Sequence, residues 1–403
     1  MMNNTVQLGL KENWRQFTLL VIVNAFVGGM IGMERSIFPQ FASLEFGIDS
    51  KTAILSFITA FGISKAITNY FTGKVANIYG RKNLLLFGWL LAIPVPFLLI
   101  YAPSWNWVIF ANVLLGISQG LTWSSTVVMK IDIVGQKNRG FAMGLNEFAG
   151  YFSVGIVAFL TGYVANKYGV TPYPFYIGVF ISIVGFLLSA FWVKDTRLFV
   201  QKETDTNFTS KLNNVFIETT FKNKTLSSVT QAGLINNLND GMIWGLLPIV
   251  LLSLHFNNSQ IGIITATYPA VWGIGQLFTG KMSDHYSKKQ MLFFGMLLQG
   301  VAILFIPFTT KFYDLIFIAV ILGVGTALVY PTFLSTIAQV TSPNQRAESI
   351  GVFRLWRDLG YAIGAVISGI TADLFGVEYA IFLISGLTIL SSLIIKLRMP
   401  EIK

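Results

Sequence analysis

Long runs of apolar residues, separated by short polar segments, fill almost the whole chain. A helix that crosses a membrane needs about 20 mostly apolar residues, and twelve runs approach that length. They cover approximately residues 17–40, 52–72, 84–101, 105–129, 140–163, 173–193, 226–253, 259–279, 291–308, 312–338, 348–372 and 377–395. The pattern therefore predicts an all-α membrane protein with twelve transmembrane helices.

One polar segment is longer than the others and divides the predicted helices into six and six. It covers residues 194–225 and contains six Lys or Arg residues. We therefore predict three parts, which are an N-terminal six-helix bundle at 1–193, a linker at 194–225 and a C-terminal six-helix bundle at 226–403.

The composition agrees with a lipid bilayer as the main solvent. Of the 403 residues, 54% are hydrophobic and only 11% are charged, whereas a soluble domain has roughly 25% charged residues. The chain has no Cys and only two His, so the usual ligands of a zinc–thiolate site and the usual nucleophile–His pairs are scarce. We expect no metal, no cofactor and no enzymatic activity.

The net charge of +10 is unevenly distributed. Twenty Lys or Arg residues lie in the termini, the linker and the loops on one side of the predicted helices, and three lie in the opposite loops. Short cytoplasmic loops are enriched in Lys and Arg, so we expect a plasma-membrane protein with both termini and the linker in the cytoplasm. The positive charge then marks topology, and no nucleic-acid partner is expected.

A basic turn occurs twice in the chain. Residues 72–85 and 279–292 are identical at six of fourteen positions without a gap, at an offset of 207 residues. The same offset relates Arg139 to Arg346. An offset of half the chain is far longer than a solenoid repeat, and it predicts two duplicated halves in parallel orientation.

With these features the chain resembles the major facilitator superfamily, whose signature Gly-x-x-x-Asp-Arg-x-Gly-Arg-Arg lies between helices 2 and 3. The positions that carry this loop motif in the two copies are Gly73, Asn77, Gly80, Arg81, Lys82, Gly280, Asp284 and Lys288. Asn77 stands at the acidic position, and Asn112 stands where many proton-coupled members have an Arg on helix 4. The resemblance implies two halves that rock around a midplane solute site, and a loop that latches helix ends in one access state.

Several Asp, Glu, Lys and Arg residues fall inside the predicted spans, away from their ends. An ionised group at the centre of a bilayer costs about 2.5–3.5 kcal/mol, so each should face a cavity or a partner. Glu147 and Arg354 occupy equivalent positions of the two halves, 207 residues apart. We predict that Glu147 exchanges a coupling proton and that Arg354, with Arg357, binds an anionic group of the substrate. The alternative is that each residue only pairs with a neighbouring helix.

Three further residues complete the predicted substrate or coupling site. They are Asn236 and Asp240 on helix 7 and Tyr151 on helix 5. Polar side chains also link helices in membrane bundles without any ligand, which is the alternative for these positions. Glu34 and Arg35, near the outer end of helix 1, are expected to anchor that helix at the membrane surface or to form an outer gate.

Lys65 and Asp358 fall at similar depths on predicted helices 2 and 11. These helices meet across the two halves in the resembled family, so a Lys65–Asp358 salt bridge is expected to close the cytoplasmic side as a gate. A permanent local salt bridge is the alternative.

Together these residues predict a secondary active transporter in the lipid bilayer. It would move a small polar or anionic solute by alternating access, coupled to a proton or another ion, as a monomer. The main alternative is proton-coupled export of drugs or hydrophobic metabolites, which would tolerate the loss of charge in the cavity. A receptor without transport and a membrane enzyme are further alternatives. The sequence selects neither a substrate nor a direction of transport.

Overall fold

The structure is a computed structural model that describes residues 7–134, 139–201, 212–341 and 343–401. The helices of the first half are α1 (Trp14–Gly32), α2 (Phe38–Phe46), α3 (Lys51–Tyr79), α4 (Arg81–Ala92), α5 (Pro94–Ile100), α6 (Trp105–Val134), α7 (Arg139–Tyr168) and α8 (Tyr173–Phe191). The linker contains the short helices α9 (Arg197–Gln201), α10 (Val215–Ile217) and the π-helix η2 (Glu218–Lys222).

The second half repeats this order. Its helices are α11 (Lys224–Ser253), α12 (Asn258–His285), α13 (Lys288–Phe305), the 3-10 helix η3 (Ile306–Phe308), α14 (Phe312–Val340), α15 (Pro343–Phe375) and α16 (Val377–Arg398). Eleven segments of the described chain are long and apolar enough to cross a membrane. The twelfth crossing is α11, which has 30 residues and a polar centre that lowers its mean hydropathy.

Two of the crossings are built from two helices each, and proline explains both breaks. A proline lies in the first turn of α2, and Pro94 begins α5. Because proline has no N–H and clashes with the preceding turn, a helix tends to restart there. The first break, at residues 33–37, was not predicted, because the apolar run at 17–40 reads as one helix.

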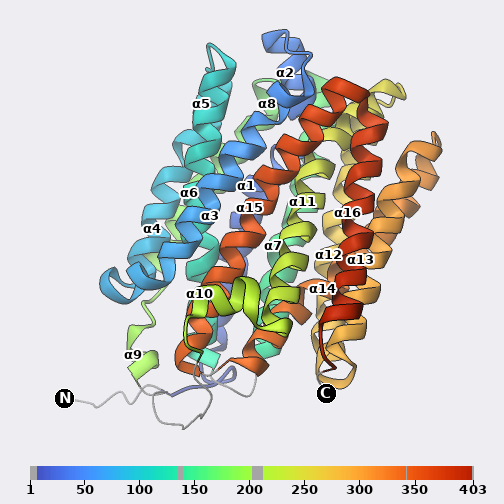
Figure 1. Ribbon diagram of the computed structural model, residues 1–403. Helices are drawn as coiled ribbons and strands as arrows, with labels where there is room; N and C mark the ends of the chain where they lie inside the picture. Colours follow the sequence, from blue (N-terminus) through green and yellow to red (C-terminus); the bar gives the residue numbers. More distant parts are fainter. Residues whose placement is uncertain (1–6, 135–138, 202–211, 342, 402–403) are drawn as a thin grey trace.

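The two halves stand side by side (Figure 1), and two helix pairs form most of the interface between them. These pairs are α3 with α15 and α7 with α12. Small residues let the helices approach closely. An added Cβ on Gly162 would lie 2.8 Å from the Cα of Gly262, and one on Gly62 would lie 2.8 Å from the backbone nitrogen of Ala362. The all-α fold with two six-helix halves is therefore confirmed.

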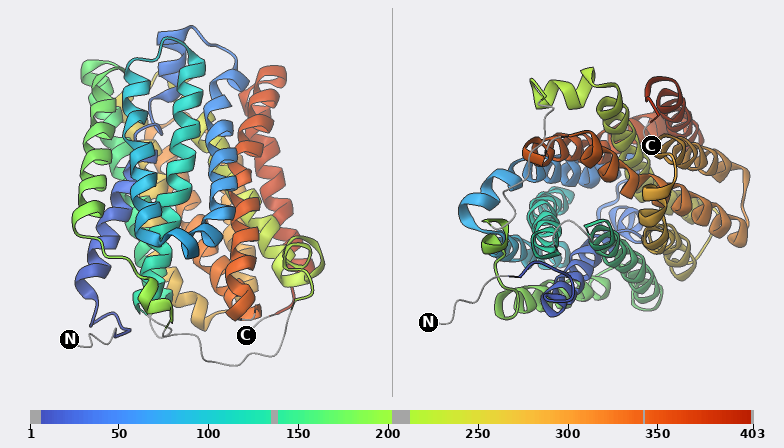
Figure 2. Two further views of the ribbon diagram at one scale, coloured as in Figure 1. Left: turned by 90° about the vertical axis from the view of Figure 1, so that its left-hand side faces the viewer. Right: turned by 90° about the horizontal axis from the view of Figure 1, so that it is seen from below.

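The two ends of the bundle differ. The helices α9 and α10 and the end of α16 lie at the same end, which we call the terminal end (Figure 1). The opposite end, which we call the far end, carries the short helix α2 and the start of α3. The views in Figure 2 show the same arrangement from the side and from the terminal end.

Candidate functional site

A pocket lies between the two halves near the middle of the bundle. Its lining residues come from α3, α6, α14 and α15 and are Lys65, Asn69, Trp123, Ser124, Tyr330, Arg354 and Arg357. Lys65 is the central residue of the 29-residue helix α3, which places the pocket near mid-depth. Three lining residues are cationic and none is acidic, so the pocket favours an anion.

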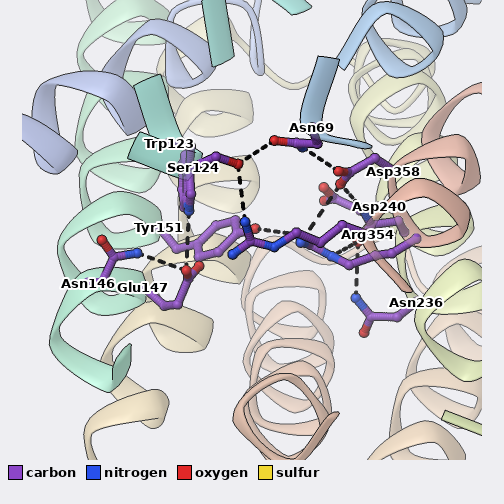
Figure 3. A network of polar contacts seen from close by, with 12 residues as sticks. Asn69, Trp123, Ser124, Asn146, Glu147, Tyr151, Asn236, Asp240, Arg354 and Asp358 are labelled. Atoms are coloured by element: carbon purple, nitrogen blue, oxygen red, sulfur yellow. Dashed lines mark hydrogen bonds and ion pairs between the residues drawn. The ribbon is translucent and has the colours of Figure 1, made fainter. Parts of the chain in front are cut away.

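A chain of hydrogen bonds crosses the interface at this pocket (Figure 3). The Arg354 Nη1 group donates to Ser124 Oγ at 3.1 Å, and Ser124 Oγ donates to Asn69 Oδ1 at 2.6 Å. The Asn69 amide then donates to Asp358 Oδ2 at 2.5 Å. The chain begins and ends on α15 and passes through α6 and α3, so it holds the two halves together.

The expected salt bridge between Lys65 and Asp358 is not among the ion pairs of the described residues. The Lys65 Nζ atom instead lies 5.3–5.6 Å from the ring centroids of Phe61, Trp123 and Tyr361. Asn69 lies one turn further along the same face of α3, and its shorter side chain reaches the Asp358 carboxylate. The predicted contact between helices 2 and 11 is therefore made by Asn69.

Arg357 is buried and has several partners. It donates from Nη2 to the Tyr151 hydroxyl at 3.1 Å and from Nε to Asn237 Oδ1 at 3.3 Å. Its guanidinium also lies 4.5 Å from the ring centroid of Tyr330, and it is 3.8 Å from the Asp358 carboxylate. Arg354, by contrast, is only half-buried. Arg354 is therefore the more accessible cation in the pocket.

Glu147 is buried beside the pocket (Figure 3). Its Oε1 atom accepts hydrogen bonds from the Asn146 amide at 2.8 Å and from Trp123 Nε1 at 3.2 Å. Its Oε2 atom has no hydrogen-bond partner among the described residues. Both donors are neutral, so the carboxyl group has polar neighbours but forms no ion pair within the described chain.

Tyr151 joins the pocket to an aromatic group of the second half. It lies one turn after Glu147 on α7, and its ring stacks on Trp272 of α12 with centroids 3.5 Å apart. Trp272 in turn neighbours Tyr268 and Tyr330 at 5.8 Å. The predicted site residue Tyr151 therefore contacts both Arg357 and the aromatic group.

Asp240 lies outside the pocket lining, because it is paired with Arg35. The two side chains form two contacts of 2.7 and 2.8 Å, and their exposed fractions are 0% and 3%. Arg35 also lies 4.7 Å from the Trp244 ring centroid. Because Arg35 is buried, the expectation that it anchors helix 1 at the membrane surface is wrong. The pair joins the α1–α2 break to α11 and thus links the two halves.

Asn236 lies one turn before Asp240 on α11. Its amide nitrogen is 3.4 Å from Asn237 Oδ1, and its own oxygen has no partner among the described residues. Figure 3 shows Asn236 on the α11 side of the polar network. The structure therefore brings Asn236 to the site through Asn237 and Arg357.

Glu34 is a buried carboxyl group, whereas the sequence analysis predicted it near the outer end of helix 1, at the membrane surface or in an outer gate. It is 0% exposed, and neither of its oxygens meets a hydrogen-bond donor in good geometry among the described residues. Asn112 of α6 is its polar neighbour. The sequence signal that could have found this burial is the pair of charges Glu34 and Arg35 inside one apolar run.

The basic turn between α3 and α4 is held by two acids. Gly80 has φ +90°, a conformation that favours glycine, and Arg81 pairs with Asp132 at the end of α6 at 3.2 Å. The Lys82 backbone N–H donates to Asp195, after α8, at 3.2 Å. Partial burial alone would raise the pKa of Asp195, but hydrogen bonds from the N–H groups of Arg197 and Lys82 leave this pKa below its usual value.

The remaining loop-motif residues are less informative. The side chains at 73–78, which include Gly73 and Asn77, and that of Asp284 lie outside the described part of the structure. In the second copy Lys288 is buried, and an added Cβ on Gly280 would meet no atom within 4 Å. A latch at Asn77 therefore stays a prediction.

A third contact between the halves lies at the far end. Asp373 near the end of α15 accepts hydrogen bonds from the backbone N–H groups of Lys51 and Thr52 at 2.6 and 2.9 Å. It also accepts one from the Ser50 hydroxyl at 2.8 Å. These donors belong to the start of α3, where a helix has unsatisfied N–H groups. Asp373 therefore caps α3 across the interface.

Comparison with known proteins places the chain among transporters. The sequence model of the Major Facilitator Superfamily matches residues 20–227 and again residues 229–402. An uncharacterized MFS-type transporter from Methanocaldococcus jannaschii is 28% identical over 165 residues, which are 41% of this chain and 43% of that relative.

Longer matches cover most of the chain. The proton-coupled antiporter flippase LtaA of Staphylococcus epidermidis is 25% identical over 375 residues, which cover 89% of this chain and 87% of LtaA. The multidrug resistance protein MdtG of Salmonella arizonae is 22% identical over 394 residues, covering 94% and 95%.

A solved structure shares the fold. The crystal structure of the human organic anion transporter MFSD10 superposes with a TM-score of 0.71 at 15% sequence identity, covering 94% of this chain and 99% of that one. The resemblance in the loop motif, the six-plus-six architecture and the double family match agree with one another. The chain therefore belongs to the major facilitator superfamily of membrane transporters.

Proposed function

We propose that this transporter moves a small solute that carries an anionic group, by alternating access around the pocket between α3, α6, α14 and α15. The observation that carries the proposal is the charge of the lining, where of the three cations Lys65, Arg354 and Arg357 only Arg357 has a carboxylate, that of Asp358, within 4 Å among the described residues. In this state the cavity measures about 10 Å³, which is room for about one water molecule, so a carboxylate or phosphate would enter only when the two halves move apart and would then pair with these cations. Arg binds such groups through two parallel hydrogen bonds, and half-buried Arg354 is the side chain best placed to do so.

Glu147 is the proposed proton-coupling residue. A buried carboxylate without a cation is unfavourable, and binding a proton removes its charge. Glu147 has no cation within 4 Å among the described residues, its two hydrogen-bond donors are neutral and one of its oxygens has no partner there, while the buried cations Lys130 and Lys65 act on it only from a longer distance. The relative LtaA is named a proton-coupled antiporter flippase, which supports coupling to protons here. Buried Glu34 is the competing carboxyl group.

The contacts between the halves support a state that is closed at the far end. Asp373 and the Arg35–Asp240 pair bind across the interface on that side. With the basic residues at the terminal end facing the cytoplasm, the pocket would be closed to the outside. To open the pocket to the outside, the contacts at the far end would have to break. The halves would then be held together at the level of the Asn69–Asp358 bond.

The test is uptake into proteoliposomes with a panel of organic carboxylates, phosphate esters, neutral sugars and cationic dyes, with and without a pH gradient. We expect uptake of at least one anion that is lost in Arg354→Gln. Arg15→Gln is the matched control, because Arg15 is exposed on α1 and lies over Trp14. Transport of neutral or cationic solutes alone would contradict the proposal.

Export of drugs or hydrophobic metabolites is the second candidate function. It is favoured by the stacked aromatic group of Tyr151, Trp272 and Tyr268 beside the pocket. The relative MdtG is named a multidrug resistance protein. This function predicts that Arg354→Gln keeps full transport of an apolar dye, whereas the first proposal predicts a loss of anion uptake in the same vesicles.

A further inference from the structure

A short segment of the linker crosses the terminal end of the bundle. Residues 212–222, which we call the strap, contain α10 and η2 and lead directly into α11 at Lys224. The Asn214 side chain accepts the backbone N–H of Ile217 and so begins the helical part of the strap. Seen from below in Figure 2, the strap lies outside the ring of membrane helices, beside α11 and α15. It therefore occupies the rim of the protein.

One side of the strap is bound to α15 at two points. The backbone N–H and carbonyl of Leu212 both bond to the Gln345 side chain, at 2.7 and 2.8 Å. The Trp356 indole N–H donates to the Thr220 hydroxyl at 3.1 Å. Val215 and Thr219, between these two points, are buried. The strap therefore follows α15 from the first turn of that helix to the level of Arg354 and Arg357.

The other side of the strap is apolar and exposed. Phe221 is 62% exposed, and Phe216 and Ile217 are also exposed. Leu397 at the end of α16 adds another exposed apolar side chain at the terminal end. Such side chains avoid water, and no helix of the described chain covers them.

Cations surround this apolar side. The exposed basic residues at the end of the strap and beside it are Lys222, Lys224 and Arg398. Arg398 connects α16 to the strap, because its Nη2 group donates to the Phe221 carbonyl at 2.8 Å. Glu218 is the acid of the strap itself and is half-buried. The strap therefore combines exposed aromatic side chains with a net positive border.

We propose that the strap lies in the membrane surface, binds anionic phospholipids and transmits their presence to α15. Helices with aromatic residues on one face and basic residues at the border lie in the headgroup layer, with their apolar side chains in the acyl region. Basic residues next to a membrane helix attract anionic headgroups. Because the strap is bonded to α15 at Gln345 and Trp356, a lipid that holds the strap also restrains the helix that carries Arg354, Arg357 and Asp358.

Lipid binding by the strap is a property separate from solute transport, and the two experiments that test it use no transported solute. The first test asks whether the strap contacts lipid. The natural chain has no Cys, so a single Phe221→Cys can carry an environment-sensitive fluorophore in the full-length protein. The protein is reconstituted into phosphatidylcholine vesicles with and without phosphatidylglycerol, and quenching by brominated acyl chains and by iodide in water is compared.

The label at position 221 is expected to be quenched by brominated lipid and protected from iodide, most strongly with phosphatidylglycerol. Leu390→Cys, at an exposed apolar position within α16, is the reference for a lipid contact. Replacing both Lys222 and Lys224 by Gln should remove the effect of phosphatidylglycerol. A label that iodide quenches and brominated lipid leaves unchanged would overturn the proposal and leave the apolar side for a protein partner.

The second test asks whether the strap transmits the lipid signal. Gly351→Cys places a thiol on α15 between the two attachment points, where an added Cβ meets no atom within 4 Å. Phosphatidylglycerol is expected to change its alkylation rate by a membrane-impermeant maleimide by roughly two- to tenfold, the range that one hydrogen bond can supply. Thr220→Val and Trp356→Phe each remove the same bond from one side, and each should abolish this lipid effect. Equal rates in the two lipids, or an effect that survives in both variants, would refute the transmission.

Discussion

The Arg35–Asp240 pair shows how individual charges are accommodated in this molecule. Both side chains are buried, both Asp oxygens are bonded to the guanidinium, and the Trp244 ring covers the cation. Removal of one partner from a buried ion pair leaves an uncompensated charge, whereas removal of both partners is often tolerated. The pair therefore joins the α1–α2 break to α11 through two charged hydrogen bonds.

Asp240→Asn should lower the free energy of unfolding by about 3–5 kcal/mol, because Arg35 remains buried and unpaired. The melting temperature of the detergent-solubilised protein measures this change. The double variant Arg35→Met with Asp240→Leu should recover most of the loss. Equal melting temperatures for the single variant and the natural protein would show that the pair does not stabilise this state.

Glu147→Gln should abolish uptake driven by a pH gradient while solute exchange without a gradient continues. The amide keeps the size of the side chain but cannot take up and release the coupling proton. Fluxes in proteoliposomes measure both quantities, and Glu378→Gln, at an exposed position near the start of α16, is the control. If the Glu147 variant keeps both fluxes and Glu34→Gln loses the pH-driven one, the coupling residue is Glu34.

Single residues were predictable from the sequence by type and depth, but their partners were not. The repeat led to Glu147 and Arg354, and both lie at or beside the pocket. The Lys65–Asp358 bridge is not formed among the described residues in this state, because the rotation of α3 about its axis presents Asn69 to the carboxylate, and its role as a cytoplasmic gate stays a prediction. Depth along a helix follows from counting residues, whereas rotation depends on packing against neighbouring helices.

At the scale of elements, α15 connects most features of the molecule. It packs on α3 and α11, carries the pocket residues Arg354 and Arg357, and caps the start of α3 through Asp373. A helix that makes contacts at three levels can transmit a change at one level to the others. The access state should therefore respond to contacts at either end of α15.

Asp373→Asn should loosen the far end, because the cap on α3 loses its charge. Hydrogen exchange of the Lys51 and Thr52 amides is expected to accelerate roughly two- to tenfold, since these bonds lie in an exposed site where solvent competes. Asp314→Asn is the matched control, because Asp314 is exposed and its one side-chain bond among the described residues is from the nearby Thr309 hydroxyl. Unchanged exchange at residues 51 and 52 would contradict a cap that closes the far end.

Helices were predicted well in number and order, and less well in length and continuity. The structure extends α3 to Tyr79 and begins α15 at Pro343, beyond the apolar runs at 52–72 and 348–372. Polar residues continue a helix past the hydrocarbon layer, so an apolar run gives only a minimum length. The break at 33–37 was missed because a length criterion detects apolar runs and not local backbone geometry.

At the scale of the whole molecule, two duplicated halves face each other across a positively charged pocket. The contacts at Asp373 and at the Arg35–Asp240 pair join the halves, and the hydrogen-bond chain from Arg354 to Asp358 crosses the interface at mid-depth. The duplication and the parallel halves were visible in the 207-residue offset. The charge of the pocket could not be predicted from this offset, because it depends on which intramembrane acids form ion pairs with cations of other helices.

The central claim is that the pocket selects solutes by their negative charge. The most direct test is uptake of a matched pair of solutes, an organic acid identified by the panel and its neutral methyl ester, in the same proteoliposomes. We expect the acid to be taken up at least roughly tenfold faster than the ester, since loss of a charged hydrogen bond costs about 1.5–3 kcal/mol. Arg354→Gln should remove this preference. Equal or faster carrier-dependent uptake of the ester, with no change in Arg354→Gln, would contradict it.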